Sequence, residues 1–322
     1  MTDAPARPAV STAQPEDYVQ LLKPRVMSLV IFTAVTGLIV APGDMHPLSA
    51  ALAILCIAVG AGAAGALNMA LEGETDALMR RTRGRPVAAG RVKQGDAMTY
   101  GVVLSVFSVM LLGMAANWFA AGLLALTIVY YAGFYTLLLK RRTPQNIVIG
   151  GAAGALPPVI GWAAATGQAP WQAWLLFLII FLWTPPHSWA LALYSAGDYA
   201  RAGIPMMPVA KGAKSTRNQI VLYSLLFVPA AVAPTFVDGL GGVIYGVVSI
   251  VGGVAFLALA ARVWRSRAGD QPDKAEAVGR EAALYDVRAE AKPARNLFAF
   301  SILYLMALFA ALLVEQIPGL GL

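Results

Sequence analysis

The chain has 322 residues, of which 58% are hydrophobic and 13% are charged, with a formal net charge of +7. Soluble domains carry about 25% charged residues, so this composition excludes an ordinary soluble domain and indicates a membrane protein with several spans. One cysteine and two histidines leave too few ligands for a disulfide or a cysteine-based metal cluster.

The elements predicted along the chain begin with a disordered, cytoplasmic N-terminal tail at residues 1–17, which is rich in Ala and Pro. Residues 18–315 are predicted to form one transmembrane domain, followed by a short non-cytoplasmic tail at residues 316–322. The sequence predicts an all-α, polytopic membrane protein, a bundle of nine transmembrane helices. The predicted spans are Val26–Val40, Leu48–Leu71, Met98–Ala116, Phe119–Leu139, Ile147–Thr166, Trp174–Tyr194, Gln219–Val237, Gly242–Val263 and Leu297–Glu315.

The distribution of basic residues supports this count. All 24 Lys and Arg residues fall on one side of a nine-span topology, in the N-terminal segment, in alternate connections or, for Arg262, at the adjoining end of a span. The positive-inside rule then places the N-terminus and the basic loops in the cytoplasm and the C-terminus outside. The positive charge belongs to loops beside anionic lipid and does not indicate nucleic-acid binding. A bacterial inner membrane is the simplest location.

Two long basic loops, Glu72–Gly95 and Ser195–Asn218, each follow an even-numbered span. Both mix acidic and basic residues with Gly and Pro. This similarity suggests duplicated four-helix units, residues 18–140 and 141–263, to which a loop and a ninth helix are added.

The end of the second span carries a row of oxygen-bearing side chains. Asn68, Glu72 and Asp76 follow one another at intervals of four residues, which places them on one stripe of a helix. Carboxylate and amide oxygens are the ligands that hard cations such as Mg²⁺ prefer. Polar groups at the end of an apolar run are costly in a membrane and are usually functional. The stripe is therefore a candidate metal site.

Basic residues follow the stripe directly. Arg80, Arg81, Arg83 and Arg85 can bind phosphate oxygens in pairs, so the segment predicts a site for a metal–diphosphate. Its position at a membrane surface suggests a substrate with a charged head and an apolar tail. Lys140 and Arg141 begin a later basic cluster, which serves either as an orientation signal or as a further diphosphate-neutralising group.

His187 follows Pro185 and Pro186 within the sixth span. The two prolines are expected to kink the helix and to open space beside it. A histidine here is either a hydrogen-bonded packing residue or a functional group, because an ionisable side chain at membrane depth is usually functional.

The pattern N-x-x-x-E-x-x-x-D followed by R-x-R-P resembles the first acidic motif of the UbiA-type intramembrane prenyltransferases. Further blocks are similar to the heme-farnesylating branch of that family, and the resemblance runs from about Tyr18 to Glu315. These blocks are LLKPRVMSLVIFTAVTGLIVAPG at Leu21–Gly43, the segment Lys140–Gly167, WTPPHSWALALY at Trp183–Tyr194, and DYARAGIPMMPV at Asp198–Val209.

The resemblance implies roles for the candidate residues. Metal-binding and catalytic roles fall to Asn68, Glu72, Asp76 and Asp198. Asp198 stands for the second acidic motif, which usually has another acid where this chain has Gly197. This departure leaves open whether one or two Mg²⁺ ions bind. The implied diphosphate-binding residues are Arg80, Arg83, Arg85, Lys140 and Arg141, and the implied heme contact is His187.

The implied reaction transfers the farnesyl group of farnesyl diphosphate to a vinyl group of heme b (protoheme IX), giving heme O and pyrophosphate. A heme A synthase or a terminal oxidase assembly would then receive the product. Two alternatives remain open at this stage. One is a sister prenyltransferase that acts on an aromatic or quinone precursor, and the other is a transporter or non-catalytic heme binder. A transporter is expected to place ionisable groups at mid-membrane in several helices, whereas the acids here cluster in the loops.

Overall fold

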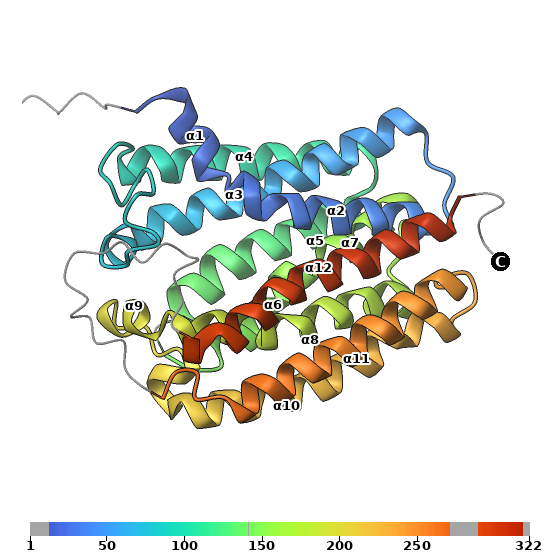
Figure 1. The fold of residues 1–322 in the computed structure, drawn as a ribbon. Coiled ribbons are helices and arrows are strands. Elements are labelled where there is room, and N and C mark those ends of the chain that lie inside the picture. The colour runs from blue at the N-terminus through green and yellow to red at the C-terminus, as the bar shows by residue number, and fades with distance from the viewer. Residues whose placement is uncertain (1–12, 141, 271–288, 318–322) are drawn as a thin grey trace, which may run out of the picture.

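The computed structural model describes residues 13–140, 142–270 and 289–317, and within these ranges all regular structure is helical (Figure 1). The helices are α1 (Pro15–Leu21), α2 (Pro24–Val40), α3 (Pro47–Ala77), α4 (Gln94–Ala115), α5 (Trp118–Val129), the π-helix η1 (Tyr130–Leu139), α6 (Asn146–Ala155), α7 (Pro157–Thr166), α8 (Trp171–Tyr194), α9 (Ala196–Arg201), α10 (Met207–Val232), α11 (Val243–Arg265) and α12 (Lys292–Glu315). Two short 3₁₀ helices are η2 (Ala233–Phe236) and η3 (Ala289–Ala291).

The membrane-spanning helices agree with the predicted fold class. In the described ranges, eight helices are long and apolar enough to cross a membrane. A ninth span is α2, which meets this criterion together with α1, from which it is bent by 50°. We take α2 as the span because α1 carries Glu16 and Asp17. The all-α, polytopic prediction is therefore confirmed.

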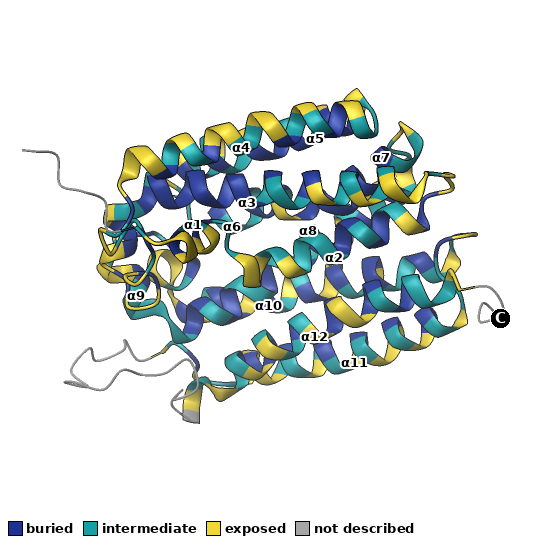
Figure 2. Ribbon diagram, turned by 90° about the horizontal axis from the view of Figure 1, so that it is seen from above, coloured by how far each residue is buried: buried dark blue, intermediate teal, exposed yellow. Residues whose placement is uncertain are grey.

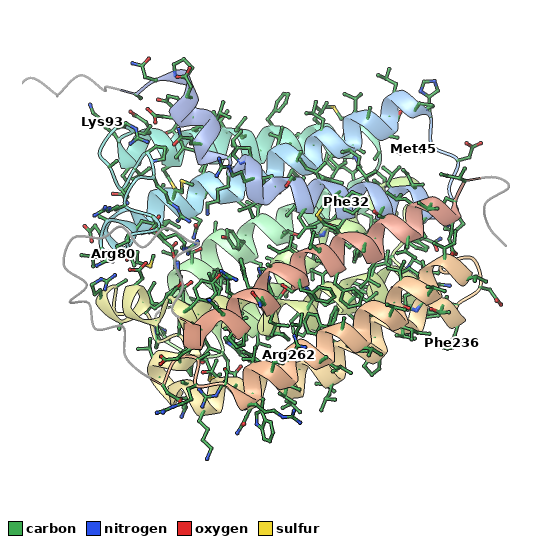
Figure 3. All side chains as sticks on the ribbon, in the orientation of Figure 1. Phe32, Met45, Arg80, Lys93, Phe236 and Arg262 are labelled. Atoms are coloured by element: carbon green, nitrogen blue, oxygen red, sulfur yellow. The ribbon has the colours of Figure 1, made fainter. Side chains whose placement is uncertain are left out.

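The long helices lie side by side, and the chain turns at two opposite ends of the bundle (Figure 1). Arg80 and Lys93 lie at one end, whereas Met45 and Phe236 lie at the other (Figure 3). The predicted basic loops that the structure describes thus gather at one end, which also holds the short helix α9 (Figure 1).

Helix boundaries differ from the predictions at several breaks. The fourth span consists of α5 and η1, and the fifth is divided into α6 and α7, because Pro157 cannot donate an amide to the preceding turn. The glycine-rich eighth span is an unbroken helix, α11. Helix α10 begins inside the predicted second basic loop and contains a kink at Gly212, whose φ is 79°. Helix α1 begins at Pro15, inside the predicted disordered tail.

Small residues let α2 and α7 approach each other closely. A Cβ added to Gly37 would collide with the backbone carbonyl of Pro158, and one added to Gly161 would collide with the carbonyl of Ala34. Close backbone contact through glycine is a general device of membrane helix packing, where no water is released to drive association.

Candidate active site

Helix α3 carries the predicted stripe on a buried face. It is 31 residues long and continues past the predicted end of its span at Leu71 to Ala77. Asn68, Glu72 and Asp76 are 2%, 5% and 1% exposed, whereas Glu74, which lies off the stripe, is exposed. The burial of this end of α3 is visible in Figure 2. The three residues thus share one face of one helix.

The amide of Asn68 is held in a defined orientation. Its Nδ2 donates to Thr136 Oγ1 at 3.2 Å, and Thr136 in turn donates its single hydroxyl proton to the Tyr131 carbonyl at 2.7 Å. Thr136 must therefore act as the acceptor for Asn68. The amide oxygen of Asn68 consequently faces the other way and accepts from Lys23 Nζ at 2.6 Å.

Each carboxylate of the stripe is paired with a base. Glu72 Oε1 lies 2.6 Å from Lys140 Nζ, and Asp76 Oδ2 lies 2.7 Å from Arg85 Nη1. The second oxygen of Asp76, Oδ1, is buried and has no hydrogen-bond partner among the described residues. A buried carboxylate oxygen without a partner is costly, so this atom is open to a cation or a water molecule.

The donor set of the stripe fits Mg²⁺. The stripe offers two carboxylates and one amide oxygen, and Mg²⁺ prefers oxygen ligands. One of the carboxylate oxygens has no partner. So few protein ligands also suit this ion, which usually keeps several water molecules. No three Asp, Glu, His or Cys side chains in the described part of the chain lie close enough together to hold one ion. The structure thus brings Glu72 and Asp76 together on α3 but does not add Asp198 to a shared cluster.

The arginine-containing loop after α3 is held by hydrogen bonds in addition to the pair of Arg85 with Asp76. Thr82 Oγ1 donates to the Asp76 carbonyl at 2.8 Å. Arg91 binds the Asp17 carboxylate at 2.8 Å and the Gly84 carbonyl at 3.1 Å, and so links α1 to the loop. Hydrogen bonding to Arg91 holds the pKa of Asp17 below its ordinary value, so this ion pair persists at neutral pH and is lost only in acid.

The remaining predicted diphosphate-binding residues differ in their surroundings. Arg80 and Arg83 are exposed, and Arg85 is half-buried against Asp76. Arg141 lies outside the described residues. The exposure of these bases thus decreases from Arg80 and Arg83 in the loop to Arg85, which lies against the buried stripe.

Asp198 lies on α9 and forms an ion pair with Arg201, one helical turn away. A small core cluster that contains Met79 and Tyr199 packs the loop after α3 against α9. Asp198 therefore lies at the same end of the bundle as the stripe, although its carboxylate is paired with Arg201 of the same helix.

His187 lies on α8 in an aromatic stack, with ring centroids 4.1 Å from Trp183 and 4.5 Å from Phe298. Its Nδ1 lies 2.7 Å from Ser301 Oγ on α12, and Ser301 donates its only hydroxyl proton to the Phe298 carbonyl at 2.6 Å. Ser301 must then accept from Nδ1–H, which leaves the lone pair on Nε2. The geometry gives His187 the tautomer that a metal ligand through Nε2 requires.

Sequence patterns did not reveal Lys23, Thr136 or Ser301. Lys23 belongs to a basic N-terminal segment that the positive-inside rule already explains, and Thr136 and Ser301 are small hydroxyl residues within apolar spans. For Lys23, the one local signal was the Lys–Pro pair at the start of the first span. Proline favours the first position of a helix, and α2 begins at Pro24.

Comparison with known proteins agrees with this architecture. The model of the UbiA prenyltransferase family matches residues 29–279. The protoheme IX farnesyltransferase of Caulobacter sp. (strain K31) is 63% identical over 98% of this chain and 93% of its own length.

Solved structures share the fold at low sequence identity. A structure of digeranylgeranylglyceryl phosphate synthase superimposes with a TM-score of 0.72 at 15% identity, covering 94% of this chain and 98% of the other. A UbiA homologue from Archaeoglobus fulgidus bound to GPP and Mg²⁺ gives a TM-score of 0.57 at 15% identity. The match covers 92% of this chain and 100% of the homologue. The fold, the length of the family match and the high identity to a curated relative lead to one conclusion: this chain belongs to the UbiA prenyltransferase family.

Proposed function

We propose that the protein transfers the farnesyl group of farnesyl diphosphate to a vinyl group of heme b, giving heme O and pyrophosphate. The observation that carries this proposal is the buried Asn68, Glu72 and Asp76 stripe, faced by bases, at the end of a membrane-spanning helix. The choice of heme and farnesyl follows from the relative at 63% identity, whose name states both.

The bases neutralise the charge that develops on the leaving diphosphate. Arg80, Arg83, Arg85, Lys140 and Arg141 are assigned to its oxygens, and Asn68, Glu72 and Asp76 to Mg²⁺, with Asp198 completing the site from α9. One or two bound Mg²⁺ ions would supply further positive charge at the same oxygens. Charges that are fixed before the reaction stabilise the transition state without having to reorganise.

The apolar bundle protects the reacting carbon. Departure of pyrophosphate leaves an allylic cation, which water would quench, so the farnesyl chain must be held among membrane helices. A heme vinyl group then forms the new carbon–carbon bond with this cation. Water adds to the resulting heme-side cation and loses a proton, which gives a hydroxyethylfarnesyl group.

Heme is assigned to the face of α8 that carries His187. If its Nε2 ligates heme iron, His187→Ala is expected to weaken heme b binding by about 100-fold and Ser301→Ala by about 10-fold. Absorption titration of the Soret band measures both. His46→Ala is the matched control, because His46 is exposed in a connection at the opposite end. Unchanged heme affinity in His187→Ala would contradict the assignment.

The proposed setting is a bacterial inner membrane, with the N-terminus and the site loops in the cytoplasm and the C-terminus outside. Farnesyl diphosphate would approach from the cytoplasmic surface with its tail in the bilayer. The heme O product would pass to a heme A synthase or to terminal oxidase assembly.

Purified protein, heme b, farnesyl diphosphate and Mg²⁺ provide the decisive assay, with mass analysis of the extracted hemes. A hydroxyethylfarnesyl heme that forms with Mg²⁺ and fails to form after chelation supports the proposal. Parallel reactions offer aromatic and quinone precursors as acceptors. Prenylation of one of these, with heme left unchanged, would assign the protein to a different acceptor.

A further inference from the structure

Lys23 lies at the junction of α1 and α2 in an unusual backbone conformation. Its φ of 53° is the only positive φ of a non-glycine residue in the described ranges. An L residue is held in this region only when its surroundings require it. Here the Lys23 carbonyl accepts from the amides of Val26 and Met27 at 2.9 and 3.0 Å and so begins α2. The start of α2 thus fixes the point from which the Lys23 side chain leaves the backbone.

The side chain of Lys23 runs along α3 into the stripe. A Cβ added to Gly65 would lie 3.4 Å from Lys23 Cδ, so the glycine leaves the side chain a close path along the helix. The amine ends 2.6 Å from Asn68 Oδ1 and 5.9 Å from the centre of the Tyr131 ring. Lys23 therefore brings a basic side chain to the candidate metal-binding face of α3.

The site contains one base for each member of the stripe. Lys23 faces Asn68, Lys140 faces Glu72, and Arg85 faces Asp76. The three bases come from three segments: the α1–α2 junction, the end of η1 and the loop after α3. Three bases thus converge on one helix face, where they offset the charge of its two carboxylates.

A metal ion and these bases compete for the same oxygens. Mg²⁺ held by the stripe would take the Asn68 amide oxygen and the Glu72 carboxylate, both of which accept from a lysine amine in this structure. An ammonium group displaced from a poorly solvated site is unstable unless another anion takes over its charge. Diphosphate supplies that anion and binds ammonium through charge-assisted hydrogen bonds.

We propose that Lys23 is a further diphosphate-binding residue, and that Lys23 and Lys140 exchange stripe oxygens for diphosphate oxygens when Mg²⁺ enters. This inference rests on the proposed function, because it assumes a diphosphate substrate. Its consequence is that the lysines disfavour Mg²⁺ alone and favour Mg²⁺ together with diphosphate. Metal and substrate then promote each other's binding by the same factor.

The experiment measures binding rather than turnover, with Mg²⁺ and inorganic pyrophosphate as probes in isothermal titration calorimetry. Lys23→Met keeps the apolar stem and removes the charge. It is expected to tighten Mg²⁺ binding in the absence of pyrophosphate and to weaken pyrophosphate binding in the presence of Mg²⁺, each by about 10- to 100-fold. Opposite shifts of the two affinities are the signature of the exchange, because a purely structural lysine would not produce them.

Arg25→Met is the matched control, because Arg25 is an exposed base two residues further along the same helix start. It should leave both affinities unchanged. If Lys23→Met does not fold, Lys23→Gln retains a donor for Asn68 without the charge and should still weaken pyrophosphate binding. Folded Lys23 variants with wild-type affinities would overturn the inference and leave the proposed function standing. Failure of the wild type to bind Mg²⁺ and pyrophosphate would overturn both.

Discussion

Asp76→Asn is expected to lower kcat for heme farnesylation by about three orders of magnitude. The substitution keeps the shape of the side chain but removes the charge that Arg85 pairs with, at 2.7 Å. It also replaces the carboxylate whose Oδ1 is buried and open to a cation. Because the charge on the leaving group grows toward the transition state, the loss should appear mainly in kcat rather than in KM. Steady-state release of pyrophosphate measures both constants.

Glu74→Gln provides the matched control for this variant. Glu74 lies on the same end of α3, two residues away, but is exposed and off the stripe. The same change of charge there should leave kcat close to the wild-type value. Wild-type turnover in a folded Asp76→Asn protein would remove Asp76 from the site and with it the basis for the metal assignment.

Gly161→Ala is expected to destabilise the bundle by about 3 kcal/mol, the upper end of the usual cost of overpacking a core. The added methyl group would meet the backbone carbonyl of Ala34, which cannot rotate away as a flexible side chain can. Helices α2 and α7 would have to separate along their contact. Thermal unfolding in detergent, followed by helical circular dichroism, should show a clearly lowered Tm.

Gly154→Ala tests the same chemical change without the collision. Gly154 is exposed on α6, and a Cβ added there meets nothing within 4 Å. This variant should be neutral or slightly stabilised, because alanine favours a helix over glycine by about 0.5–1 kcal/mol. Equal Tm values for the Gly161 and Gly154 variants would show that α2 and α7 are not in close contact.

Features that depend on local periodicity were predictable from the sequence. Apolar runs locate the spans because every backbone polar group in a bilayer must be satisfied within a helix. The four-residue spacing of Asn68, Glu72 and Asp76 puts them on one face for as long as the helix continues, and α3 continues to Ala77. The predicted second span ended too early, at Leu71.

Features that depend on tertiary packing were not predictable in this way. Lys23 and Asn68 are 45 residues apart, and His187 and Ser301 are 114 residues apart. Neither pair has a local pattern, because the contacts arise from how α2 and α12 pack against α3 and α8. The ion pair of Asp198 with Arg201 is instead a local contact, because the acid and the base lie one turn apart on α9. The duplication of four-helix units remains a prediction.

The length of α3 ties the depth of the site to the thickness of the bilayer. Its 31 residues extend over about 46 Å at ~1.5 Å per residue, against a hydrocarbon core of about 30 Å. A helix that enters the core at Pro47 leaves it near Leu67, so the stripe begins where the acyl chains end. In a thicker membrane the polar side chains would be drawn into hydrocarbon, and in a thinner one they would rise into water. Acyl-chain length is therefore expected to change the hydration of the candidate site without any change in the protein.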